Sequence, residues 1–105
     1  MRFIETPVFT RSVKQFMTDD EYHSMQLALI FRHELGATIP GSGGLRKLRW
    51  SVPGKGKRGG LRVVYFWHAN SETFCMLYAY EKNNQQNLTQ TQLQLLNRLV
   101  REEFQ

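Results

Sequence analysis

Three features are scarce in this sequence, and each excludes a class of protein. Cys75 is the single cysteine among 105 residues. It can form no internal disulfide, provides no Cys pair for zinc, and lies in an apolar strand pattern typical of a buried thiol. No segment approaches the ~20 apolar residues that span a membrane, and residues 1–11 lack the apolar run of a secretory signal. We therefore expect one reduced, cytoplasmic domain, residues 1–105.

Acidic side chains are also missing from the middle of the chain, with none between Glu34 and Glu72. The same stretch holds half of the fourteen lysines and arginines: Arg46, Lys47, Arg49, Lys55, Lys57, Arg58 and Arg62. The other half is outnumbered by nine acidic residues, so the net charge of +5 arises locally. A local positive field on a small domain indicates a polyanionic partner, most commonly nucleic acid.

Two capping boxes mark helix starts, at residues 18–21 (TDDE) and 89–92 (TQTQ). In each box a threonine hydroxyl and a Glu or Gln side chain satisfy backbone N–H groups that have no partner within the helix. Apolar residues at helical spacing, Ile30 and Phe31 among them, carry the first helix to a predicted stop near Gly36. The second helix continues through an apolar stripe to the last residues. A shorter helix is predicted over residues 9–16.

The middle of the chain has the composition of a sheet. Residues 45–50, 61–68 and 72–80 are rich in apolar, β-branched and aromatic side chains and are bounded by turn residues. Residues 68–71 (HANS) predict a hairpin loop, which makes the last two strands antiparallel neighbours. With a short strand over residues 2–5, the prediction is an α+β fold: a small antiparallel sheet, two N-terminal helices and a C-terminal helix.

Strand alternation predicts which side chains share a face of this sheet. Lys47 and Arg49 lie on the same side of the first central strand. Arg62 interrupts an otherwise apolar strand, so it requires an anion, a carboxylate partner or an open cleft beside it. On the third strand, strict alternation puts four side chains on one face: Phe74, Met76, Tyr78 and Tyr80. Lys82 continues this alternation just past the end of the strand.

This placement permits two interpretations. In the first, one cationic cleft with an aromatic edge is formed by Lys47, Arg49, Arg62, Tyr80 and Lys82. In the second, Lys47 and Arg49 are a solvated sheet face and Arg62 forms a structural ion pair. The basic residues of segment 55–58 are most simply interpreted as a phosphate-contacting arm, and the alternative, a solvated run of charge, is disfavoured by the missing acidic residues. The three histidines lack the spacing of metal ligands, and we predict no metal or cofactor.

Three segments together resemble the HigB branch of the RelE toxin superfamily: residues 43–49 (GGLRKLR), 54–65 (GKGKRGGLRVVY) and 80–83 (YEKN). Leu88 and a capped helix follow, so the resemblance runs in order and spacing from about Asp19 to the end of the chain. It implies a small α+β fold related in shape to microbial ribonucleases. It also implies metal-independent cleavage of mRNA in the ribosomal A site and neutralisation by a cognate antitoxin. Operator DNA would be bound only through the antitoxin complex.

The resemblance also implies roles for individual positions. Lys47 and Arg49 match the basic pair on the strand, Arg62 the basic residue before Val-Val-Tyr, and Lys82 the lysine after the last strand. RelE itself has an arginine directly after that lysine and a tyrosine at the start of its last helix. In this sequence Asn83 and Thr89 occupy the two places, so it departs from RelE at two positions on which a simple transfer of RelE's acid–base assignment depends.

The chemistry of RNA cleavage suits these side chains. The 2′-OH of RNA can attack the adjacent phosphate, so an enzyme needs to align the reacting groups and stabilise the charge that develops. Arg62 suits a bidentate phosphate clamp, while Tyr80 can stack on a base or orient the phosphate. The predicted catalytic set is Lys47, Arg49, Arg62, Tyr80 and Lys82, without an assigned general base. Contacts to the RNA backbone are predicted for Arg46, Lys55, Lys57 and Arg58.

Two other functions use the same residues. The basic segment is also typical of a module that binds RNA or DNA without cleaving it. A cationic cleft can equally be the docking surface for an acidic protein segment, and this last reading is compatible with a toxin that binds its antitoxin there.

Overall fold

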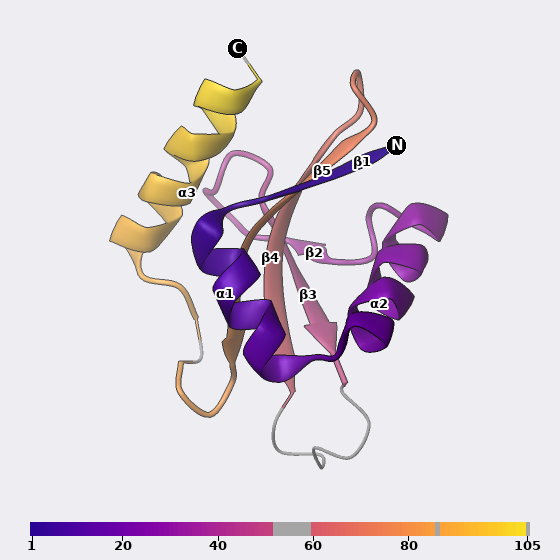
Figure 1. Cartoon of the computed structure of the whole chain (residues 1–105). Helices are drawn as coiled ribbons and strands as arrows, with labels where there is room; N and C mark the ends of the chain where they lie inside the picture. The colour runs from indigo at the N-terminus through magenta and orange to yellow at the C-terminus, as the bar shows by residue number, and fades with distance from the viewer. Residues whose placement is uncertain (52–59, 86, 105) are drawn as a thin grey trace.

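The computed structural model describes residues 1–51, 60–85 and 87–104 of the chain. Its elements are, in order, β1 (Arg2–Glu5), α1 (Pro7–Phe16), α2 (Asp19–Phe31), β2 (Ala37–Thr38), β3 (Arg46–Trp50), β4 (Leu61–His68), β5 (Thr73–Glu81) and α3 (Gln90–Glu103). Figure 1 shows the strands running between α3 at the left and α2 at the right. The predicted α+β class, the three helices and the four longer strands are confirmed.

Both predicted capping boxes are present. The Thr18 hydroxyl accepts from the backbone N–H of Glu21, whose carboxylate accepts from the N–H of Thr18. Thr89 and Gln92 make the same reciprocal pair at the start of α3. Such caps fix the starts of α2 and α3 because the first N–H groups of a helix have no acceptor within it.

The predicted stop of α2 at Gly36 is wrong, because the helix ends at Phe31. The Tyr65 hydroxyl, which comes from β4, donates to the carbonyl of His33 and accepts from the N–H of Gly36. These two bonds hold the chain after the helix against the sheet and give its backbone polar groups partners outside a helix. The predicted apolar stripe is wrong at its end too, since Phe31 is 94% exposed and Ile30 42% exposed.

The sheet has five strands in the order β1-β5-β4-β3-β2. The three central strands are antiparallel, as predicted, and the β4–β5 hairpin turns where the sequence indicates. The prediction of a wholly antiparallel sheet is wrong at one edge, because β1 pairs parallel with β5. The strand β2, which was not predicted, consists of two residues and pairs with the start of β3.

A β-bulge interrupts the pairing of β4 with β5. Tyr65 lies opposite Met76, but its neighbour Val64 lies opposite Tyr78, so Leu77 is an extra residue on β5. One extra residue shifts the alternation of every side chain that follows it.

The bulge corrects the predicted faces of β5. Phe74 and Met76 pack in the core beneath α1 and α2, whereas Tyr78 and Tyr80 contribute to the core beneath α3. The prediction that these four side chains share one face is therefore wrong. The same shift places Tyr80 on the side of the sheet that Arg62 faces.

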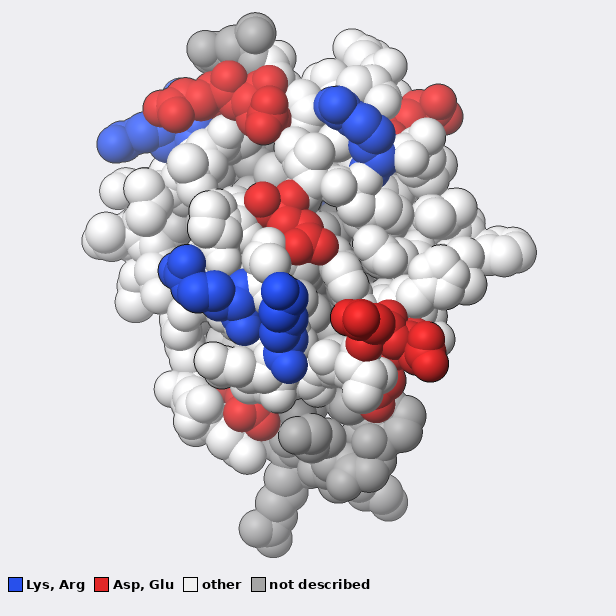
Figure 2. Space-filling model, viewed as in Figure 1, with Lys and Arg blue, Asp and Glu red and all other residues white. Residues whose placement is uncertain are grey.

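A hydrophobic core lies on each side of the sheet. Beneath α1 and α2 the packed side chains include Phe9, Val13, Met25, Leu29, Leu48, Val63 and Phe74. Beneath α3 they include Val64, Cys75, Leu77, Leu96 and Val100. On the molecular face viewed in Figure 2, basic and acidic side chains lie intermixed. Within the described ranges, no helix combines the length and the apolar character needed to cross a bilayer.

Candidate active site

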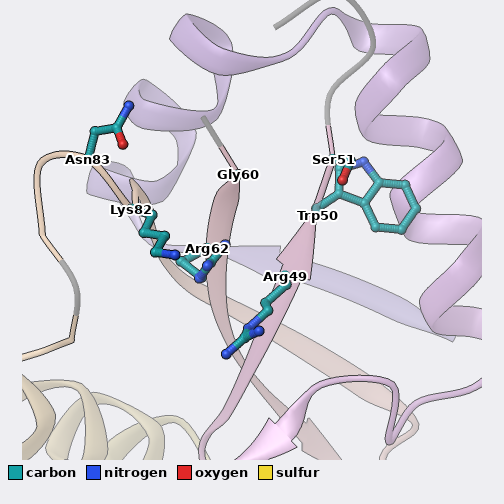
Figure 3. Close-up of a pocket in the computed structure, with 7 residues that line it drawn as sticks. All are labelled: Arg49, Trp50, Ser51, Gly60, Arg62, Lys82 and Asn83. Atoms are coloured by element: carbon teal, nitrogen blue, oxygen red, sulfur yellow. The ribbon is translucent and has the colours of Figure 1, made fainter. Parts of the chain in front are cut away.

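A pocket of about 470 Å³ lies at the end of the sheet opposite the β4–β5 hairpin. The end of β3, the start of β4 and the residues after β5 line it: Arg49, Trp50, Ser51, Gly60, Arg62, Lys82 and Asn83. We call it the basic pocket. In Figure 3 the ends of the Arg62 and Lys82 side chains meet, and the Arg49 side chain extends from β3 below them.

Strand register explains why these residues meet. Arg49 pairs with Arg62 across β3 and β4, and Arg62 pairs with Tyr80 across β4 and β5. Side chains directly opposite one another on adjacent strands share a face. The backbone N–H of Lys82 donates to the carbonyl of Gly60 at 3.2 Å. This bond extends the β4–β5 pairing beyond the last strand residue and positions Lys82 beside Arg49, Arg62 and Tyr80.

Arg62 is the buried member of this group, with 8% of the residue exposed. Its guanidinium lies against Gly60, where an added β-carbon would be 2.8 Å from Nη1 of Arg62. Among residues 1–51, 60–85 and 87–104, no carboxylate forms an ion pair with Arg62. Glu81, which lies between Tyr80 and Lys82 in the sequence, pairs with Leu61 and therefore belongs to the other face. The predicted alternative of a structural ion pair for Arg62 is absent from the described part of the chain.

An anion is the complement that this arrangement favours. Burying a charge is costly without a counter-charge, and three neighbouring cations repel one another. Near a protein surface, two opposite unit charges ~4 Å apart attract by about 4 kcal/mol before desolvation costs. A phosphate in the basic pocket would therefore relieve the repulsion among Arg49, Arg62 and Lys82.

Lys47 and Tyr80 line a neighbouring hollow. This second pocket, about 400 Å³, is bounded by residues 37–40, Lys47, Tyr80, Asn87, Leu88 and Leu93. The Lys47 ammonium donates to Oδ1 of Asn87 at 3.1 Å. Of the predicted catalytic residues, the structure thus gathers Arg49, Arg62 and Lys82 in the basic pocket and places Lys47 and Tyr80 in the adjoining one.

The Tyr80 ring is buried, with 4% of the residue exposed. Burial raises the pKa of its phenol, and the positive charge of Arg62 opposes that shift only in part. The phenol therefore stays protonated at neutral pH, and a protonated phenol can donate a hydrogen bond but cannot accept a proton as a general base. Burial also raises the pKa of the Cys75 thiol to about 11, which keeps this residue from acting as a thiolate nucleophile.

Of the residues predicted to contact the RNA backbone, the structure describes Arg46 and does not bring it to the basic pocket. Arg46 faces the opposite side, paired with Tyr65, and its guanidinium donates to the carbonyls of Gly36 at 2.7 Å and Glu34 at 3.4 Å. These bonds tie β3 to the segment after α2. The other predicted backbone contacts, Lys55, Lys57 and Arg58, lie outside the described residues.

The histidines lie away from the basic pocket. His68 is at the far end of β4, bonded through Nδ1 to the Ser71 hydroxyl and stacked on Phe104. His33 stacks on Trp67. In the described segments, no group of three or more His, Cys, Asp or Glu side chains is arranged to hold a metal ion.

Sequence reasoning missed several residues at the two pockets. Gly60 had a signal, since it is the last of the glycines before Arg62, but its contact with the guanidinium depends on the fold. Asn87 had none, because forty residues separate it from Lys47 in the sequence. Trp50 lines the basic pocket yet packs against the core beneath α1 and α2.

Fold and pocket together define a class: a small α+β protein with a basic pocket at one end of its sheet. A family model described as "RelE toxin of RelE / RelB toxin-antitoxin system" matches residues 1–105. The chain therefore belongs to the RelE toxin family, and its fold is compatible with that family. Membership makes it a toxin of a toxin–antitoxin system. Toxins of this family pair with an antitoxin and are generally endoribonucleases.

Proposed function

We propose that this toxin is an endoribonuclease that cuts mRNA in the ribosomal A site and so arrests translation in the cytoplasm until a cognate antitoxin neutralises it. The observation that carries the proposal is the buried Arg62, which has no carboxylate partner in the described ranges and lies between two further cations. RelE family membership supplies the expectation of an RNA substrate.

The proposed reaction is attack by the 2′-OH of one nucleotide on the phosphate that joins it to the next. The 2′-oxygen forms a bond to phosphorus while the bond from phosphorus to the 5′-oxygen breaks. The products are a 2′,3′-cyclic phosphate and a 5′-OH, so one proton leaves the 2′-oxygen and one is taken up by the 5′-oxygen. Negative charge accumulates on the nonbridging oxygens of the phosphorane between these events.

The cations divide this work by position. Arg62 presents a planar guanidinium suited to bidentate contact with two phosphate oxygens, and its burial strengthens that interaction. Arg49 and Lys82 are exposed and raise the positive potential around the phosphate. The positive charge for catalysis thus comes from the protein's own side chains.

The test compares Arg62→Ala with Arg11→Ala, a variant of an exposed arginine on α1. Removing a group that stabilises a developing anion costs about 10²–10³ in rate. We expect Arg62→Ala to abolish growth arrest while fold and antitoxin binding are retained, and Arg11→Ala to behave as wild type. The measurement is primer-extension mapping of cellular mRNA after brief induction of each variant.

Each result has a distinct meaning. New 5′ ends at defined codon positions with wild type and Arg11→Ala, and none with folded Arg62→Ala, support the proposal. Undiminished cleavage by folded Arg62→Ala would refute the role of Arg62. Growth arrest by wild type without new 5′ ends would favour a nucleic-acid-binding module that does not cleave.

A further inference from the structure

The second pocket adjoins the basic pocket along the same face of the sheet. Lys47 and Arg49 lie two residues apart on β3, so their side chains share a face about 7 Å from one another along the strand. Tyr80 pairs directly with Arg62. A ligand group beside Arg62 and a group bonded to it can thus occupy the two pockets together.

The lining of the second pocket differs in kind from that of the first. Its walls are mainly aliphatic, with Ile39 and Pro40 on one segment and Leu88 and Leu93 on another. A volume of about 400 Å³ falls within the ~300–1,000 Å³ range of small-molecule sites, which combine apolar walls with a few polar groups. A flat heteroaromatic ring fits these aliphatic walls better than a phosphate does.

Asn87 supplies the polar group at the rim of this pocket. Its Oδ1 accepts from the Lys47 ammonium, which has only donors, so the orientation of the amide is fixed. The amide nitrogen is thereby left to donate, and in the part of the chain that the structure describes it has no acceptor. A donor at the rim selects for a base edge that carries a carbonyl oxygen or an unprotonated ring nitrogen.

We infer that the second pocket receives the nucleobase adjacent to the phosphate held in the basic pocket, and that Asn87 selects which base it accepts. The inference rests on the proposed function, because it takes the phosphate to belong to RNA. It adds a specificity determinant distinct from the cations, and it gives codon preference a physical origin in one rim amide.

The experiment uses RNA that cannot react, so binding is read without cleavage. Trinucleotides with 2′-O-methyl groups, differing in the base at one position, are titrated into the protein while backbone amide signals are followed by NMR. We expect base-dependent shifts at Ile39, Leu88 and Leu93, and their loss when that position is abasic.

Asn87→Asp and Asn84→Asp form a matched pair of variants. Both positions are exposed, and Asn84 lines neither pocket. Asn87→Asp keeps an oxygen for Lys47 but replaces the donor with an acceptor. We expect it to change the order of preference among the four trinucleotides by at least about tenfold, toward a base with an amino donor, while Asn84→Asp leaves the order unchanged.

The outcomes separate this inference from the proposal beneath it. Shifts confined to Arg49, Arg62 and Lys82, with no dependence on the base, would overturn the base pocket and leave the phosphate site standing. No shift at either pocket would overturn the inference, whereas the proposed function is decided separately by the primer-extension test. Perturbation of the second pocket by the antitoxin alone, and never by RNA, would assign it to protein contact and also refute the inference.

Discussion

The two faces of the sheet are built from the same alternating strands, but at the end that carries the basic pocket one face bears apolar side chains and the other bears charged ones. The face beneath α1 and α2 is filled to that end, with Leu48, Leu61 and Ala79 in its core. On the other face, the row formed by Arg49, Arg62 and Tyr80 lies at the border of the α3 core. The first face stabilises the fold, and the second leaves charged groups positioned for a ligand.

Arg46 and Arg62 express this contrast in single residues. They lie on neighbouring strands and face opposite sides. Arg46 is bound to two backbone carbonyls of its own chain, while Arg62 is buried and has no carboxylate partner in the described residues. An arginine bound to internal carbonyls contributes to stability, and one without a carboxylate partner among the described residues is available to an external anion.

The largest effect is expected from Phe9→Ala on the α1 and α2 side. Phe9 is fully buried, and truncating such a side chain costs about 3–5 kcal/mol through lost burial and the cavity left behind. Urea unfolding should show this loss, with RNA cleavage per folded molecule unchanged. Val8→Ala, an exposed neighbour on the same helix, is the control. Equal losses for the two variants would mean that this face does not carry the stability of the fold.

Arg46→Ala should have an intermediate effect, on stability alone. It removes hydrogen bonds from a charged donor to two carbonyls, at a cost of about 1.5–3 kcal/mol. Cleavage by the folded variant should match wild type. The sequence predicts instead that Arg46 contacts RNA. Reduced cleavage with undiminished stability would support that prediction and break the contrast with Arg62.

A smaller effect, on cleavage alone, is expected from Gly60→Ala. The new methyl group would lie 2.8 Å from Nη1 of Arg62, and the end of a flexible side chain can move away from it. We expect cleavage about tenfold slower, equivalent to about 1.4 kcal/mol, with the free energy of unfolding within about 1 kcal/mol of wild type.

The control for this variant is the double substitution. In an Arg62→Ala background, Gly60→Ala should cause no further loss of activity, because the group that it displaces is gone. Additive losses would show that Gly60 acts independently of Arg62.

The sequence predicts the elements well where the signal is local. Both capping boxes and the HANS hairpin depend on a few adjacent residues, and each is found as predicted. The end of α2 depends on Tyr65, which is distant in sequence, and the strand β2 is too short to carry a pattern. The bulge at Leu77 has no signature in an apolar strand, so the prediction that Phe74 and Met76 share a face with Tyr78 and Tyr80 was wrong, whereas Tyr80 does face the side of Arg62.

The candidate site follows the same division. Arg62 could be identified from sequence because an arginine within an apolar strand is conspicuous, and Lys47 and Arg49 because they alternate on a short strand. The separation into two pockets could not, since it depends on residues 37–40 and Asn87 meeting beside Lys47. The catalytic roles of these side chains remain predictions that the measurements above address.

The contact between Arg62 and a nonbridging phosphate oxygen is tested most directly by sulfur substitution at the cleaved linkage. Single-turnover cleavage of ribosome-bound mRNA would be measured with each of the two phosphorothioate diastereomers at that position. Wild type should cut one diastereomer markedly more slowly than the other, and Arg62→Ala should cut both at the same low rate. An equally large difference between the diastereomers in folded Arg62→Ala would contradict the assignment of Arg62 as the phosphate clamp.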